Sequence, residues 1–137
     1  MPYTLIDHTA DIGISVTGDS PAELFSEAAR AMFDQITDRA RLSGAHRKQI
    51  EVTGIDRTDL LVNFLRELLC FWTIDGCLVK NVWIPYINDE RLTADVAWDE
   101  FTPETHEILE DIKAVTYHGI SVDETDAGWR ATIIFDV

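Results

Sequence analysis

Two segments with the same apolar spacing constrain the fold of this chain more than any other feature. The first stripe comprises Leu24, Phe25, Ala28, Ala29, Met32, Phe33 and Ile36, and the second, 36 positions later, comprises Leu60, Leu61, Phe64, Leu65, Leu68, Leu69 and Trp72. Apolar residues at this spacing line one side of an α-helix. Ser20, Pro21 and Glu23 supply an N-cap, a first-turn proline and a capping-box acid ahead of the first stripe. Asp56 and Asp59 repeat the cap and the acid before the second. The sequence therefore predicts two amphipathic helices, each preceded by a strand, in a pattern that suggests a duplicated unit.

The remaining regular segments have the alternation and the β-branched content of strands. They cover residues 3–6, 12–17, 48–52, 78–87, 91–98, 111–118, 120–123 and 129–135, with a hairpin connection at 88–90 and a polar loop at 100–110. Strands that follow one another late in the chain, after two helices, indicate an α+β fold. We expect a single domain over residues 1–137, with both helices packed on one face of a largely antiparallel sheet of seven to eight strands.

The charge of the chain limits the partners that it can bind. Twenty-five acidic residues against 11 basic ones give a net charge of -14. Nucleic-acid backbones attract Lys and Arg, so direct, tight RNA or DNA binding is disfavoured. The segment from Asp99 to Asp126 contains nine acidic residues and only one basic residue, Lys113. Such a surface would steer the protein toward a basic partner, although acidic residues also serve solubility alone.

The sequence shows no pattern typical of a membrane span, a signal peptide or a redox or zinc-binding cysteine pair. No run approaches the ~18 consecutive apolar residues of a membrane span, and the first residues lack the features of a signal peptide. A cytoplasmic location and no membrane association are therefore expected. Cys70 and Cys77 are too far apart for a redox or zinc pair. We expect both to be reduced thiols, with Cys70 acting as a small buried hydrophobe, although their spacing alone does not exclude a disulfide.

Carboxylates near the two ends of the chain are the candidate metal ligands. Asp7 and Asp11 interrupt two apolar runs at the start, and Asp136 follows the last predicted strand. If the two ends meet, their oxygens would suit a hard cation such as Ca²⁺ or Mg²⁺. Each aspartate also has a structural interpretation, as a turn residue that bonds its own backbone or as a solvated terminal group.

The sequence gives little indication of nucleotide binding or catalysis. No glycine-rich phosphate loop and no nucleophile motif is present. His8 and His118 have the side chain of a general acid or base, but each borders a predicted strand, where a structural hydrogen bond is more usual. Lys113 is either a phosphate or carboxylate contact or a charged surface residue. No catalytic residue and no organic-cofactor site is assigned.

Taken in order, these segments resemble the archease family over nearly the whole chain. Four segments carry the resemblance: Asp7-His8-Thr9-Ala10-Asp11-Ile12-Gly13; the helical motifs Glu27-Ala28-Ala29 with Met32-Phe33 and Asp59-Leu60-Leu61 through Phe64-Leu65 to Glu67-Leu68-Leu69; Lys113-Ala114-Val115-Thr116-Tyr117-His118; and the closing segment from Trp129-Arg130-Ala131 to Phe135-Asp136-Val137. The first and last motifs are the specific ones, because the helical matches are ordinary amphipathic patterns.

The resemblance implies a function in tRNA processing. Archeases are cofactors of the RtcB-type tRNA-splicing RNA ligase, whose guanylylation and multiple turnover they promote without being catalysts themselves. A chaperone-like effect on a tRNA methyltransferase is an older proposal for the family. The resemblance also implies a divalent cation, calcium in the first place with magnesium or manganese as alternatives, bound by Asp11, Asp136 and the last residue, Val137.

Two other classes of function remain open at this level. One is a small metal-dependent hydrolase in which Asp11 and Asp136 hold the cation and His8 or His118 acts as base. The other is a general chaperone that acts on RNA-modifying enzymes, which the acidic composition would suit. A purified protein that hydrolyses phosphoesters alone would identify the first, and effects on unrelated client proteins would identify the second.

Overall fold

The computed structural model describes residues 2–6 and 11–137, which form two helices, one 3₁₀ turn and seven strands. In chain order these are β1 (Tyr3–Ile6), β2 (Asp11–Gly18), α1 (Pro21–Ile36), η1 (Arg39–Arg41), β3 (His46–Thr53), α2 (Arg57–Thr73), β4 (Cys77–Ile87), β5 (Arg91–Glu100), β6 (Ala114–Thr125) and β7 (Gly128–Asp136). The α+β class and both helices are confirmed, and the stretch between β5 and β6 contains no helix or named strand.

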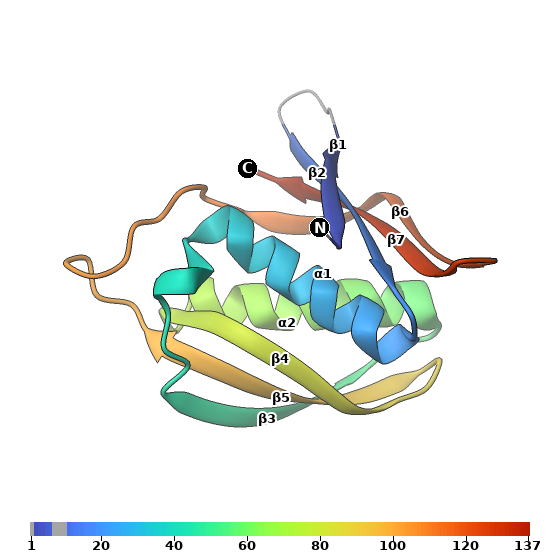
Figure 1. Ribbon diagram of the computed structural model, residues 1–137, viewed down its shortest axis with the longest axis horizontal. Coiled ribbons are helices and arrows are strands. Elements are labelled where there is room, and N and C mark those ends of the chain that lie inside the picture. Colours follow the sequence, from blue (N-terminus) through green and yellow to red (C-terminus); the bar gives the residue numbers. More distant parts are fainter. Residues whose placement is uncertain (1, 7–10) are drawn as a thin grey trace.

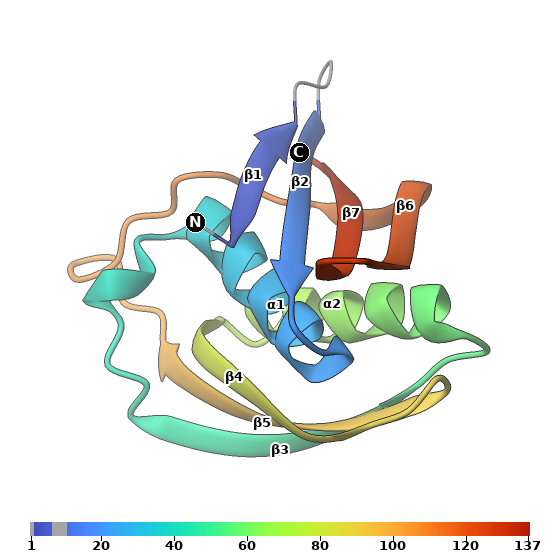
Figure 2. The same ribbon diagram turned by 45° about the vertical axis from the view of Figure 1, so that its right-hand side comes forward.

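The strands form two antiparallel sheets, and the expectation of a single sheet is wrong. One sheet has the order β1-β2-β7-β6 and the other β3-β5-β4. Both helices lie between the sheets, as Figures 1 and 2 show, with α1 against β2 and β4 and α2 against β6 and β3. A helix enclosed in this way must bury more than one side. Ser26, Ala31 and Val62 lie outside the predicted stripes and are buried as well.

The segment before the last strand also differs from the prediction. The two strands expected at 111–118 and 120–123 are one strand, β6, which begins at Ala114. Its pairing with β7 is regular up to Thr116 and again from Ser121, with an irregularity between them. Gly119 has φ +72° within this stretch, a conformation that glycine adopts without steric cost. The chain therefore bulges locally and returns to the same partner strand instead of ending there.

The repeat found in the sequence extends to the corner between strand and helix. Ser20 accepts a hydrogen bond from the Glu23 N–H, and Asp56 accepts one from the Asp59 N–H. Two glycines, Gly18 and Gly54, precede these caps. A Cβ atom at Gly18 would lie 2.6 Å from the Leu24 nitrogen, and one at Gly54 would lie 2.6 Å from the Leu60 nitrogen. Both corners thus depend on the same close approach of two backbones.

A buried carboxylate anchors the loop that leads into β3. Asp99, which is 9% exposed, accepts hydrogen bonds from the backbone N–H groups of Ser43, Gly44 and Ala45. Burial by itself raises the pKa of Asp99, but these backbone N–H donors outweigh it and hold the pKa below its ordinary value. Asp99 therefore belongs to the interior, and it does not contribute to the acidic surface predicted between residues 99 and 126.

This arrangement predicts how stability depends on pH. Because the folded-state pKa of Asp99 is lowered, its contribution is present above the unfolded pKa of about 3.9 and is lost as the pH falls through the folded value. Asp99→Asn should cost about 1–3 kcal/mol at pH 7 and less at pH 3, where part of the contribution of the ionised form is lost. Urea unfolding at both pH values measures this, with the exposed neighbour Glu100→Gln as control. Equal losses for Asp99→Asn at the two pH values would contradict the assignment.

Candidate functional site

The two aspartates predicted to meet are direct neighbours in the four-stranded sheet. Asp11 begins β2 and Asp136 ends β7, and the antiparallel register places them opposite each other. Figure 2 shows the carboxyl end of the chain beside the start of β2. Val137 follows directly and packs its side chain partly against the core. We refer to Asp11, Asp136 and Val137 as the carboxylate tip.

Opposite positions in an antiparallel pair place two side chains on the same face of the sheet. Their Cβ atoms are typically about 4.5–5.5 Å apart. Asp136 is exposed and Asp11 is half-buried, so the pair remains accessible to solvent. Like charges placed directly opposite one another repel, and a cation between them would remove the repulsion. The chemistry of the donor set, two carboxylates beside a backbone oxygen, fits a hard divalent ion.

The donor set is small. Over residues 2–6 and 11–137 the structure holds no cluster of three or more His, Cys, Asp or Glu side chains able to share a metal. Two carboxylates and an oxygen of Val137 are fewer than the six to eight oxygens that calcium takes, so a bound ion would have places left for water or a partner. Asp7 and His8, the other candidates from this motif, lie outside the described residues.

Asp136 is held by strands on both of its sides. On one side it pairs with Asp11 of β2, and on the other it pairs with Ala114 of β6. The backbone N–H of Lys113 donates to the Asp136 carbonyl oxygen at 2.8 Å. Lys113 is exposed and contacts Asp136 through its backbone. The main chain of Asp136 is thus held from both sides, independently of its side chain.

β6 is attached to α2 by Arg66, a residue that the sequence did not single out, and by Tyr117 and Asp59, which were named there for other reasons. Arg66 donates from Nε and Nη2 to the Val115 carbonyl oxygen, at 3.1 and 3.0 Å. The Arg66 guanidinium also lies over the ring of Tyr117, 4.7 Å from its centroid. Tyr117 in turn donates its hydroxyl to Asp59 Oδ1 at 2.5 Å. This hydrogen bond lowers the pKa of Asp59 and raises that of Tyr117. In the sequence Asp59 was identified only as a capping residue.

Other predicted residues lie away from the carboxylate tip. His118 is exposed in the irregular part of β6, four positions beyond Ala114, the residue opposite Asp136. Cys70 and Cys77 are both free thiols, as expected. The prediction that Cys70 is buried is wrong, because it lies on the solvent side of α2. Cys77 is the buried one, and burial raises the pKa of its thiol. Apolar neighbours in sequence do not decide which side of a helix a residue occupies.

Neither of the described helices has the length and hydropathy required to cross a bilayer.

Residues 3–137 match the model of the Archease protein family (MTH1598/TM1083). The chain is 32% identical to protein archease of Methanosarcina mazei, over 98% of this chain and 95% of that protein. It is 36% identical to protein archease of Pyrococcus abyssi, over 96% and 95%. The solution structure of Methanobacterium thermoautotrophicum protein 1598 superposes with a TM-score of 0.84 at 30% identity, covering 99% of both chains.

Proposed function

Because this chain belongs to the archease family, we propose that it is a protein cofactor of an RtcB-type tRNA-splicing RNA ligase. In this role it promotes guanylylation of the ligase and allows repeated rounds of RNA joining. It acts as an activator and not as a catalyst. The proposal includes a cytoplasmic location and a role in tRNA processing.

The pairing of Asp11 with Asp136 is the observation that carries the proposal. Two carboxylates on one face of a sheet, at an exposed end of the molecule, form an open donor set for a divalent cation, for which calcium is the first choice and magnesium or manganese are the alternatives. A bound ion would supply a positive charge and open coordination places to the partner. The protein itself positions the ligands, because β2 and β6 hold the Asp136 backbone and the Lys113 backbone N–H donates to its carbonyl oxygen.

The charge distribution supports a protein partner in preference to RNA alone. Apart from the buried Asp99, the acidic residues of the segment 99–126 are exposed or half-buried. An RNA ligase needs a basic surface to hold its substrate, and opposite fields accelerate the encounter of two proteins. The same acidic surface disfavours tight binding of free RNA. A tRNA methyltransferase, as another basic RNA-binding enzyme, would be attracted in the same way.

The proposal is tested with a purified RtcB-type ligase from the same cells. With the protein added, guanylylation should accelerate and the ligase should complete many turnovers, whereas removal of divalent ions from the protein should abolish the effect. The protein incubated alone with metal and phosphoester substrates serves as the control and should show no turnover. Unchanged ligase kinetics at stoichiometric protein would contradict the proposal. Hydrolysis by the protein alone would indicate an enzyme instead.

A further inference from the structure

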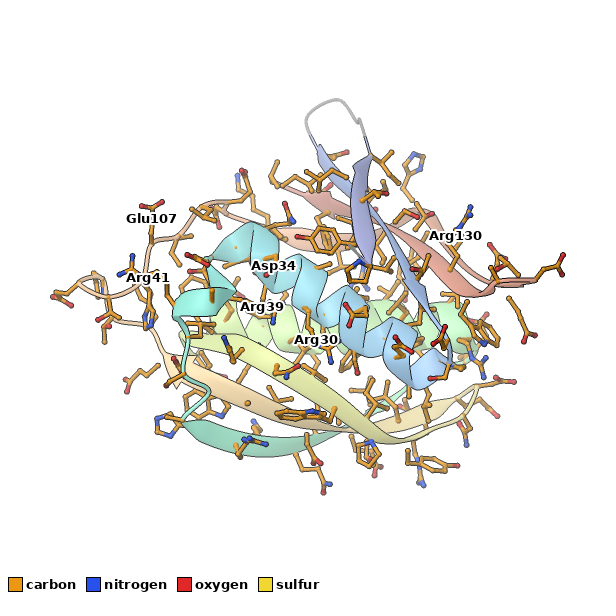
Figure 3. The ribbon with its side chains drawn as sticks, in the orientation of Figure 1. Arg30, Asp34, Arg39, Arg41, Glu107 and Arg130 are labelled. Atoms are coloured by element: carbon orange, nitrogen blue, oxygen red, sulfur yellow. The ribbon has the colours of Figure 1, made fainter. Side chains whose placement is uncertain are left out.

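A hollow of about 430 Å³ lies at the end of α1, lined by residues other than those of the carboxylate tip. Its walls come from β1, the last turn of α1, η1 and the loop at 106–109. Tyr3 of β1 lines it, and Tyr3 pairs with Val16 near the far end of β2 from Asp11. Figure 3 shows Arg41 and Glu107 at one end of the molecule with Asp34 and Arg39 nearer its middle, while Arg130 lies on the other side. The volume is within the range of small-ligand sites.

Several hydrogen bonds hold the walls in place. Asp34 accepts from the Tyr3 hydroxyl at 3.2 Å and from Arg39 Nε at 2.7 Å. Arg39 Nη1 donates to the Lys80 carbonyl oxygen at 2.7 Å. The Thr37 hydroxyl donates to the Glu107 carbonyl oxygen at 2.7 Å, which fixes the loop on the end of α1. The hollow is therefore formed by tied elements that a ligand would not need to order.

Three residues that line this hollow carry donors or acceptors without a partner among the described residues. His106 is only 9% exposed, and its Nδ1 accepts from the Thr102 N–H at 3.0 Å. The ring proton is therefore on Nε2, which is the only polar atom that His106 can offer to a ligand. Arg41 is exposed, and no ion pair or hydrogen bond joins its guanidinium to another described residue. Asp38 uses one carboxylate oxygen for the Ala40 N–H, at 3.2 Å, and keeps the other.

These unused groups define the chemistry of a ligand. A simple anion would be repelled by Asp38 and Glu107, and a simple cation by Arg41. Two N–H donors beside a carboxylate acceptor are complemented by a carbonyl oxygen, which can accept two hydrogen bonds, next to an N–H; the ring nitrogen beside the amino group of adenine accepts only one. Guanine and uracil present such an edge, and arginine is a common donor to the carbonyl oxygen of guanine. The half-buried Tyr3 ring and the guanidinium planes add flat surfaces on which a base can stack.

We propose that this hollow binds the keto–amide edge of a nucleobase, from a free nucleotide or from an unpaired RNA residue. Arg41 and His106 Nε2–H donate to the carbonyl oxygen, and the Asp38 carboxylate accepts from the neighbouring N–H. Because one neutral base enters while its phosphate stays in solvent, the acidic surface of the protein does not oppose the contact. The proposal concerns the isolated protein and is independent of its action on a ligase.

Titration of the ¹⁵N-labelled protein with mononucleotides, followed by NMR, tests the proposal. GMP and UMP should shift the amides of Thr37, Ala40 and Leu109 around the hollow, and AMP should bind about tenfold more weakly or not at all. Arg41→Ala should weaken GMP binding about tenfold, the effect of losing a charged hydrogen bond. Asp38→Asn keeps the oxygen that caps η1 but replaces the free acceptor with a donor, and it should weaken binding comparably.

Arg130→Ala is the matched control, because it removes an equally exposed arginine on the other side of the molecule. It should bind GMP as the unmodified protein does. Equal losses for Arg41→Ala and Arg130→Ala, equal shifts with AMP, the same shifts with inorganic phosphate alone, or no shifts at the hollow would each overturn the proposal. A hexauridylate that binds more than tenfold tighter than UMP would assign the site to RNA, and equal affinities would assign it to free nucleotides.

Discussion

Asp136→Asn is expected to leave the fold intact and to abolish most of the protein's stimulation of ligase guanylylation. Asp136 is exposed, and its backbone is held by β2 and β6 whatever its side chain, so the substitution removes one negative charge and no packing. The proposed ion would lose one of its two carboxylates. Because hard cations depend on anionic oxygen ligands, we expect calcium affinity to fall by at least about tenfold, equivalent to about 1.4 kcal/mol.

The experiment compares three variants of equal charge. Asp11→Asn should behave as Asp136→Asn does, while Asp123→Asn removes an exposed acid elsewhere on the same sheet and should retain full activity. Calorimetric titration with calcium, circular dichroism and the rate of ligase guanylylation are measured for each. Wild-type stimulation by both tip variants would refute the role of the carboxylate tip. Equal losses in all three would indicate that general charge, and not a bound ion, attracts the ligase.

Phe64→Ala should produce the largest loss of stability among single substitutions in the helices. The side chain is fully buried in α2, and its ring centroid lies 6.1 Å from that of Phe25 in α1. Truncation would leave a cavity between the two helices and the sheets that enclose them. Losses of about 3–5 kcal/mol are typical of such a change, and they represent a large share of the stability of a domain of this size.

Denaturant unfolding followed by tryptophan fluorescence measures this loss. Glu67→Ala, on the exposed side of the same helix, should change the free energy of unfolding by less than about 0.5 kcal/mol. Ala28 occupies the position in the first stripe that corresponds to Phe64 in the second, so the two stripes fill the core with different volumes. A loss below about 1 kcal/mol would indicate that the core collapses readily around the missing ring.

The helices could be predicted because their signals are local. Ser20 and Asp56 cap them as expected, and every residue of the two stripes except Trp72, which is half-buried, lies in the core. The division of the strands into two sheets could not be predicted, since strand pairing joins segments far apart and leaves no local pattern. The only sequence sign that α1 is enclosed was the small size of Ser26 and Ala31 outside the stripe, and small residues are equally common on the exposed side of a helix.

The candidate site was predictable in part. The sequence placed Asp11 near Asp136, and the strand register confirms that the two are neighbours, whereas a bound ion remains a proposal. The attachment of β6 to α2 through Arg66 was missed, because a lone arginine on an amphipathic helix is indistinguishable from an ordinary surface residue. The hollow beside His106 was missed for a related reason. Its walls come from four separate elements, and no spacing in the sequence connects them.

The pairing of β2 with β7 has a consequence for how the protein is made. A ribosome delivers β2 well before β7, because both helices and the strands β3 to β6 come between them. The helices and the β3-β5-β4 sheet can assemble on the emerging polypeptide, but the carboxylate pair cannot form until β7 has left the ribosome. A product of synthesis interrupted before β7 would therefore lack the pair, so ion binding would report that β7 had been made and had joined the sheet.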